Sequence, residues 1–369
     1  MRVTQFLIAL FLGSLAILAS SVWFMPNAGA APRFEWSKDK PHSYCLGQID
    51  FVDDLNGGTV CAEYFYKTSD GGRSWQIAKI FEPGAHQYGL HVEGIKFLSA
   101  TDILIFGTYV YRDASGATQN EIAIVRSIDG GATFSETVID GYEGVSRYGT
   151  ELIFNGDTGA FARRDGSAVY YTSDRAKTWR KTEPPSKNML TNISFTKNGN
   201  IRVLRFAPGK KIDVCTFDAH AATANWTCAD SQLNPPKLES GQLVGAIATN
   251  DLDVDIIAMG REKSVVGGVF MQGILLPKLK SEGSCHKIQS LGGGAMSAVC
   301  IGVDNRSVFG PEEVVRVLVS LDNGATWEVE YTASHPHIDG VAVRARTLSD
   351  GTKELFVVDG QQIAIARIH

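Results

Sequence analysis

Proline, runs of basic residues and catalytic signatures are scarce or missing in this sequence. Only 12 of its 369 residues are proline, and its 35 lysines and arginines form no block. The first observation excludes a proline-rich extended chain, and the second argues against a nucleic-acid partner. No Gly-x-Ser-x-Gly, HExxH or phosphate-loop motif is present, so the common signatures of hydrolases and nucleotide-binding proteins are lacking.

Glycine, by contrast, is abundant, with 38 residues, and hydrophobic residues make up 44% of the chain. This composition suits many short strands joined by tight turns around a sizeable core. No compositional break or long linker divides residues 31–369. We therefore expect a single all-β domain over that range.

The first 30 residues have the features of an export signal. Arg2 precedes an apolar run over 6–24, and Ala28-Gly29-Ala30 supplies small residues at the expected cleavage positions. We predict cleavage after Ala30 and a periplasmic or secreted mature chain without a membrane span. The alternative is an uncleaved membrane anchor, because the run approaches the roughly 20 residues that cross a bilayer.

Six cysteines follow the signal, in three local couples whose members are 16, 13 and 15 residues apart. An even count in an exported chain favours disulfides, and each spacing fits two adjacent antiparallel strands. A zinc site is the rival interpretation, but no CxxC or CxxH pair is present. Of the 15 possible pairings, we predict Cys45–Cys61, Cys215–Cys228 and Cys285–Cys300.

One short pattern occurs four times, with the form [ST]-x-D-x-x-x-[ST]-[WF] and usually a glycine two residues after the aspartate. An aspartate at a turn accepts hydrogen bonds from nearby N–H groups, and glycine tolerates positive φ. The terminal ring packs beside the hairpin. We call these segments the repeat turns. They contain Asp70 and Trp75, Asp129 and Phe134, Asp174 and Trp179, and Asp322 and Trp327.

The repeat turns resemble Asp boxes, also called BNR repeats, of sialidases and other propeller proteins. The resemblance implies a β-propeller of the sialidase-like superfamily, in which the boxes are structural. The gap between Asp174 and Asp322 has room for three blades of roughly 49 residues. A degraded copy lies in this gap, at Thr216-Phe217-Asp218 with Trp226. We expect six blades, with seven as the alternative count.

In such a propeller, binding residues belong in the loops that link one blade to the next, opposite the repeat turns. These loops collect histidine, tyrosine, arginine and carboxylates, which suit a polar, aromatic contact surface. Ordinary solvated loops are the alternative interpretation. Four histidines on one face raise the alternative of a metal site, but no compact ligand motif supports it, so we predict no metal and no cofactor. The predicted contact residues are His86, Tyr88, His91, Glu93, Tyr142, Glu143, Arg147, Tyr148, Glu151, His335, His337 and Asp339.

The sequence contains few of the residues that sialidase catalysis requires. That chemistry uses three arginines on the substrate carboxylate and a tyrosine nucleophile with a glutamate partner. Pro32-Arg33-Phe34 departs from the family's Arg-Ile-Pro signature, and Arg147 is the only arginine of the expected contact face with suitable neighbours. Arg344 and Arg346 alternate in a predicted strand and face the same way.

We therefore predict a non-catalytic propeller that binds a protein partner. Exported proteins of this kind include periplasmic immunity proteins and assembly factors that resemble the photosystem II stability factor. The alternative is a sialidase-like exo-glycoside hydrolase that acts on cell-surface or extracellular glycans.

Overall fold

The computed structural model describes most of the chain after residue 34. The described ranges are 35–36, 45–61, 64–80, 90–112, 115–143, 152–163, 167–185, 189–196, 198–206, 213–230, 242–248, 256–261, 268–271, 274–276, 284–292, 295–304, 312–321, 326–333, 341–359 and 362–368. All regular elements within these ranges are β-strands. The predicted signal and its cleavage point at Ala30 lie outside the described residues.

The strands form seven four-stranded antiparallel sheets, numbered here in chain order. The first contains β2 (Cys45–Phe51), β3 (Gly57–Cys61), β4 (Tyr64–Thr68) and β5 (Gln76–Lys79), and the second β6 (Leu90–Phe97), β7 (Ile103–Arg112), β8 (Thr118–Ser127) and β9 (Ser135–Glu143). The third contains β10 (Ile153–Asn155), β11 (Thr158–Ala162), β12 (Val169–Thr172) and β13 (Arg180–Thr182), and the fourth β14 (Met189–Phe195), β15 (Ile201–Phe206), β16 (Asp213–Phe217) and β17 (Thr227–Asp230). The fifth contains β18 (Gln242–Ala248), β19 (Ile256–Arg261), β20 (Gly268–Met271) and β21 (Ile274–Leu276), and the sixth β22 (Ser284–Gly292), β23 (Ala295–Asp304), β24 (Glu312–Ser320) and β25 (Glu328–Ala333). The seventh contains β26 (Val341–Thr347), β27 (Lys353–Asp359), β28 (Gln362–Ile368) and β1 (Glu35–Trp36).

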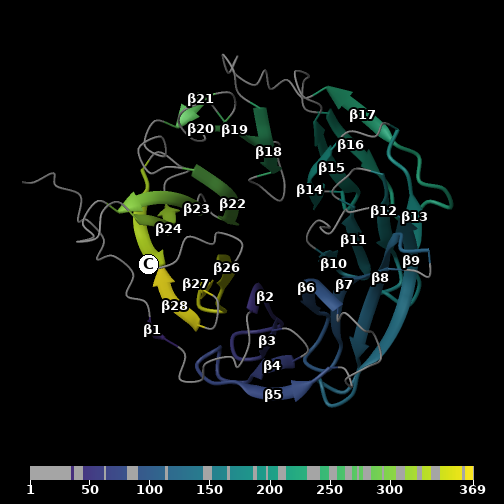
Figure 1. Cartoon of the computed structure of the whole chain (residues 1–369), viewed down its shortest axis with the longest axis horizontal. Helices are drawn as coiled ribbons and strands as arrows, with labels where there is room; N and C mark the ends of the chain where they lie inside the picture. Colours follow the sequence, from purple (N-terminus) through teal and green to yellow (C-terminus); the bar gives the residue numbers. More distant parts are fainter. Residues whose placement is uncertain are drawn as a thin grey trace, which may run out of the picture.

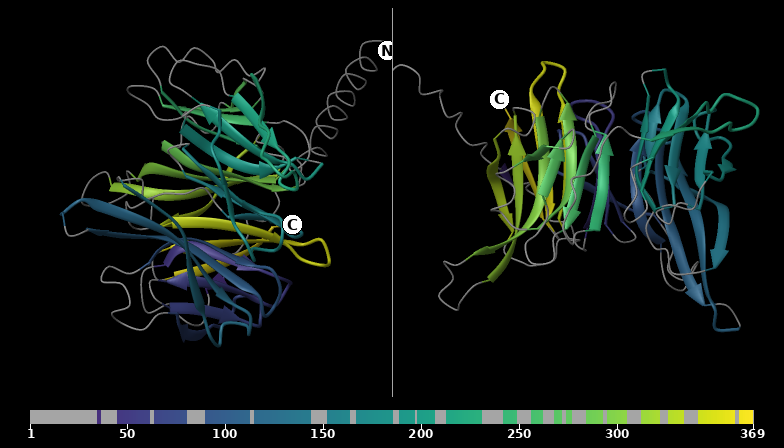
Figure 2. Two further views of the ribbon diagram at one scale, coloured as in Figure 1. Left: turned by 90° about the vertical axis from the view of Figure 1, so that its right-hand side faces the viewer. Right: turned by 90° about the horizontal axis from the view of Figure 1, so that it is seen from above.

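The seven sheets stand in a ring around a central axis (Figure 1), and the right-hand view of Figure 2 shows their strands upright, running along that axis. The first strand of each sheet lies nearest the axis, and β2 contacts both β6 and β26. The chain is thus a β-propeller, and the all-β prediction is confirmed. Six blades were expected, with seven as the alternative; the described residues form seven four-stranded sheets.

The additional sheet is the one that closes the ring. β26, β27 and β28 form this sheet together with β1 as its outer strand, with Glu35 opposite Ile365 and Trp36 opposite Ala364. Counting blades by repeat turns misses this sheet, because no repeat turn marks it.

Aromatic rings pack across several interfaces between neighbouring sheets, whereas the buried core between the sixth and seventh sheets consists of alanine, valine and leucine. Phe134 packs with Phe65 between the first and second sheets, and their ring centroids are 5.6 Å apart. Trp179 lies 5.3 Å from Phe161 of its own sheet, and Phe161 lies 4.6 Å from Phe106 of the second sheet. Aromatic rings of neighbouring sheets therefore pack against one another at these two interfaces.

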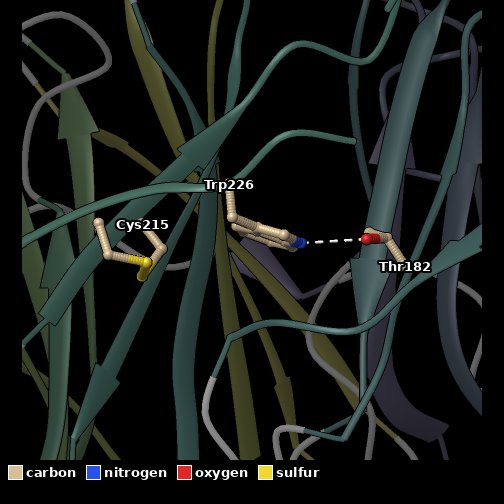
Figure 3. Close-up of a disulfide and its surroundings, with 4 residues drawn as sticks. Thr182, Cys215 and Trp226 are labelled. Carbon is tan, nitrogen blue, oxygen red and sulfur yellow. Dashed lines mark hydrogen bonds between the residues drawn. A yellow bond between two sulfur atoms is a disulfide. The ribbon is translucent and has the colours of Figure 1, made fainter. Parts of the chain in front are cut away.

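The described cysteines agree with the predicted local pairing. Cys215 and Cys228 form a disulfide with their Cα atoms 4.1 Å apart, across β16 and β17 (Figure 3). Cys61 is disulfide-bonded, and its register partner is Cys45. Likewise, Cys300 is disulfide-bonded and lies opposite Cys285 in the ladder. The Cys215–Cys228 bond thus joins neighbouring strands of one sheet.

Candidate functional site

The predicted contact loops are only partly described. His91 and Glu93 lie on β6, the innermost strand of the second sheet, where Thr108 Oγ1 donates to Glu93 Oε1 at 2.8 Å. Tyr142 and Glu143 end β9, the outer strand of the same sheet, so β7 and β8 separate them from His91. Outside the described residues lie His86, Tyr88, Arg147, Tyr148, Glu151, His335, His337 and Asp339.

In the three repeat turns that the structure describes, the aspartate accepts hydrogen bonds from residues of its own turn. Asp129 accepts hydrogen bonds from Thr133 Oγ1 at 2.6 Å, Thr133 N at 2.9 Å and Ser127 Oγ at 2.8 Å. These bonds from Thr133 and Ser127 hold the pKa of Asp129 at about 2. Burial raises the pKa of Asp174, but the corresponding bonds from Thr178 outweigh it and lower the pKa to about 2.

These carboxylates are saturated with local donors, so their role is to fix the turn. Asp70 follows the same pattern, with Ser74 Oγ at 2.6 Å and Thr68 Oγ1 at 2.9 Å. In the third copy, Arg175 and Ala176 replace the two glycines and adopt φ of 60°. The turn keeps its shape there although the residues have side chains. Asp322 lies outside the described residues.

A cavity of about 240 Å³ opens where the inner strands of the seventh, first, second and third sheets approach one another. Its position along the sheet follows from the register. Phe51 pairs with Gly57, which pairs with Thr68 at the start of a repeat turn. The cavity therefore lies toward the repeat-turn end, away from the loops where we expected the site. It is lined by Ile49, Asp50, Phe51, Gly94, Ile95, Lys96, Leu152, Arg344, Ala345, Arg346 and Phe356.

An ion pair crosses one wall of this cavity. Lys96 Nζ lies 2.9 Å from Asp50 Oδ1, and the Phe97 N–H donates to Asp50 Oδ2 at 2.7 Å. Burial raises the pKa of the Asp50 carboxyl, against the opposing effects of Lys96, the Phe97 N–H and Arg344. The Asp50 and Lys96 side chains retain 19% and 29% exposure, so solvent reaches both. A carboxyl with a perturbed pKa in a solvent-accessible cavity marks a candidate site.

Three arginines converge beside the cavity on a carboxylate of the chain itself. Glu354 is 1% exposed, and Arg346 donates to it through Nε at 3.0 Å and through Nη2. Arg367 Nε lies 3.3 Å from the same carboxylate and Arg73 Nη2 3.7 Å. The Arg346 guanidinium also lies 4.0 Å from the centroid of the Phe51 ring. This cluster joins the seventh sheet to the first.

Arg344 and Arg346 lie on the strand β26, as predicted, and both line the cavity together with Ala345 between them. Sequence reasoning missed Asp50 and Lys96, although the inner strands carry a signal. Four of them, one together with the residue before it, contain Ile or Leu, any residue, then Phe. Three of these Phe residues, Phe51, Phe97 and Phe154, occupy the same row relative to the repeat turns. The four segments are Ile49-Asp50-Phe51, Ile95-Lys96-Phe97, Leu152-Ile153-Phe154 and Ile193-Ser194-Phe195.

A tyrosine–glutamate pair is present elsewhere. Tyr109 Oη donates to Glu136 Oε2 at 3.0 Å, and burial together with this carboxylate raises the pKa of the Tyr109 phenol above its usual range. The pair belongs to the second sheet, whereas the arginines around Glu354 gather between the seventh and first. The two groups therefore do not assemble into a sialidase-like site.

Two features are absent from the described residues. No group of three His, Cys, Asp or Glu side chains there is arranged to hold a metal ion. The same part of the chain contains no helix long and apolar enough to cross a membrane.

No family model and no curated protein matches the sequence. Solved structures are similar in fold. YCF48 bound to D1 peptide has a TM-score of 0.56 and 15% identity, and the match covers 93% of this chain and 96% of that chain. A streptogramin B lyase has a TM-score of 0.55 and 13% identity, over 92% and 99%. The GH74 xyloglucanase from Xanthomonas campestris has a TM-score of 0.56 and 13% identity, over 90% and 53%.

These structures include a peptide complex, a lyase and a glycanase. At such low identity they show the fold alone, which is the β-propeller.

Proposed function

We propose that this chain is an exported, non-catalytic propeller that binds a protein partner. Its seven sheets are the blades, and the repeat turns are Asp boxes of a non-sialidase member of the sialidase-like superfamily. The observation that carries the proposal is that Arg73, Arg346 and Arg367 form ion pairs within the chain. A sialidase directs three arginines at its substrate, whereas these three surround the buried Glu354 of the chain itself.

The similar structures support binding without deciding it. YCF48, which has the same fold, was solved with D1 peptide. A closed ring of rigid sheets presents many loops on one fixed frame, which suits recognition of a protein surface. The proposed partner surface is the loop face that contains Tyr142 and Glu143, at the end of β9.

Export is part of the proposal. Its support is the pattern of the first 30 residues, together with the Cys215–Cys228 disulfide, which persists in an oxidising compartment. Neutralisation of a toxin in the periplasm and assistance in assembling another protein are the two forms of binding that fit this location.

The proposal is tested with the mature chain, residues 31–369. We expect a saturable complex with one protein of the source periplasm, seen as a shifted peak in size-exclusion chromatography. Glu143→Arg on the loop face should weaken the complex at least tenfold, as expected for loss of a charged contact. Lys177→Gln, in an exposed repeat turn, is the matched control and should leave it unchanged.

A fluorogenic sialoside assay on the same preparation separates the two classes of function. We expect no turnover above the rate without protein. Turnover that a Tyr109→Phe variant abolishes would instead assign a glycoside hydrolase, and the binding proposal would then be abandoned.

A further inference from the structure

Five large apolar side chains are exposed among the described residues, and three of them lie at the repeat-turn end of the propeller. These three are Leu55, Ile128 and Leu321, with exposed fractions of 53%, 73% and 52%. Ile128 and Leu321 directly follow β8 and β24, in the repeat turns of the second and sixth sheets. Leu55 adjoins the repeat turn of the first sheet, since its carbonyl oxygen accepts a hydrogen bond from Gly71 N at 2.9 Å. We call these three side chains the apolar tips.

The apolar tips occupy one arc of the ring. Their sheets are the sixth, the first and the second, and the seventh stands between the sixth and the first (Figure 1). Beyond the second sheet, the third has Ser173 at the position that corresponds to Ile128. Single apolar side chains on a surface are ordinary, whereas a group at one side of a ring indicates a contact there.

The chain enters the ring through the same arc. β1 begins at Glu35 and runs antiparallel to β28 in the seventh sheet. β28 ends at Ile368, which pairs with Lys353, the first residue of β27. Just before β27, Ser349 N donates to Asp54 Oδ1 at 3.0 Å, beside the apolar tip of the first sheet. β28 therefore ends at the repeat-turn end, and β1 starts from it.

The apolar run over 6–24 precedes this entry point. Both interpretations of the run, an export signal and a membrane anchor, place it in a membrane while the propeller lies outside. Residues 25–34 connect the run to β1, and such a segment extends to at most about 35 Å. A membrane that holds the run is therefore within reach of the arc that carries the apolar tips.

We propose that this arc rests on the lipid surface of that membrane, with the apolar tips inserted among uncharged headgroups. Interfacial binding strengthens with the apolar area that is buried, and a tether raises the effective concentration of the arc at the surface. The lipid is uncharged because Asp53, Asp129 and Asp350 are exposed carboxylates at the same end, which anionic headgroups would repel. After cleavage of the run the tips alone hold the contact, so it weakens.

This contact leaves the loop face open to the proposed protein partner. In the second sheet, Glu143 at the end of β9 pairs with Gln119, whereas Arg126, two residues before Ile128, pairs with Ser135. The proposed partner surface and this apolar tip therefore lie at opposite ends of the sheet. A propeller that stands on its repeat turns presents its loops away from the membrane, so the inference is independent of the partner.

The test is co-sedimentation of the chain 31–369 with phosphatidylcholine vesicles. We expect saturable binding that phosphatidylglycerol in the vesicles does not strengthen. Ile128→Ser should weaken the binding about fivefold or more, whereas Ile128→Leu should preserve it. Val138→Ser is the matched control and should have no effect, because Val138 is 46% exposed midway along the outer strand β9. No saturable binding, stronger binding to anionic vesicles, or an equal loss in the control would overturn the proposal.

A second measurement uses the full chain, 1–369, in phosphatidylcholine nanodiscs. The tryptophan introduced by Ile128→Trp should be quenched by lipids brominated on the acyl chains. The tryptophan introduced by Ala117→Trp, in the exposed β7–β8 hairpin at the opposite end, should not be quenched. Equal quenching in the two variants would overturn the proposal. Self-association that Ile128→Ser abolishes, in place of vesicle binding, would also overturn it and give the arc to a second copy of the chain.

Discussion

Arg346 Nε donates to Glu354 Oε2 at 3.0 Å, and the same guanidinium reaches the carbonyl oxygen of Gly71 at 3.3 Å and that of Asp53 at 3.4 Å. Glu354 and Arg346 belong to the seventh sheet, whereas Gly71 and Asp53 belong to the first. A second contact crosses the same interface, since Ser349 N donates to Asp54 Oδ1 at 3.0 Å. The closure of the ring is thus polar as well as aromatic.

Glu354→Ala should destabilise the propeller by about 3–5 kcal/mol, because three arginines lose their shared carboxylate and Arg346 stays buried without it. Urea unfolding followed by circular dichroism measures the change. Lys181→Gln is the control. It breaks the ion pair with Asp140, in which the lysine is 43% exposed, and should cost less than about 1 kcal/mol. Similar costs for the two changes would show that Glu354 contributes no more than a surface pair.

The repeat turns should make stability depend on pH below about pH 4. Asp129 and Asp174 have pKa values of about 2 in the folded chain, against about 3.9 when unfolded. Their contribution is complete above the unfolded value and is lost as the pH falls through the folded value. The double variant with Asp129→Asn and Asp174→Asn should show a flatter decline of unfolding midpoint between about pH 4 and pH 2. An unchanged decline would contradict the assignment.

Loss of the Cys215–Cys228 disulfide should destabilise the hairpin that carries Trp226 and change the fluorescence of this tryptophan. The Trp226 indole N–H donates to Thr182 Oγ1 of the third sheet at 3.0 Å (Figure 3), and its ring lies 4.5 Å from that of Phe217. Replacing both cysteines with serine should cost about 3 kcal/mol, given the short loop that the bond closes.

Reduction of the native chain should change tryptophan fluorescence, because the hairpin that holds Trp226 loosens. In a Trp226→Phe variant the change should vanish. A change that persists in this variant would mean that another tryptophan is the reporter.

Alanine substitutions at two glycines distinguish the energetic cost of backbone strain from the cost of steric crowding. Gly131 and Gly116 have φ of 93° and 82°, so alanine at either position costs about 1–2 kcal/mol of strain. A Cβ at Gly131 collides with the ring of Phe65, whereas one at Gly116 meets nothing within 4 Å. Gly131→Ala should therefore destabilise by about 1–3 kcal/mol more than Gly116→Ala in thermal unfolding. Equal costs would mean that Phe65 moves aside freely.

The elements that could be predicted from the sequence are those determined by local contacts. The bonds of Asp129 span at most four residues, so the pattern of its turn is visible in a short segment. Cys215 and Cys228 face each other across one hairpin, so their spacing predicts the pairing. The seventh sheet could not be predicted in the same way, because residues 35 and 365 meet only when the ring closes.

The cavity was missed for a related reason. Asp50 and Lys96 are 46 residues apart, and in sequence each is one polar residue of an alternating strand, which predicts solvent exposure. What brings them together is the contact between the inner strands β2 and β6. Only the repeated Ile-x-Phe pattern, at Phe51 and again at Phe97, indicated that these strands share a special position.

Because β1 pairs with β28, the seventh sheet can be completed only after β28 has been synthesised. The partner of Glu35 is Ile365, so β1 has no neighbour in this sheet until synthesis has reached β28. Until then, the seventh sheet lacks its outer strand and the ring is unsealed. A chain cut short before residue 365 would keep an unpaired β1 and an open seam, which makes it a ready target for proteases. The fold thereby distinguishes complete chains from truncated ones.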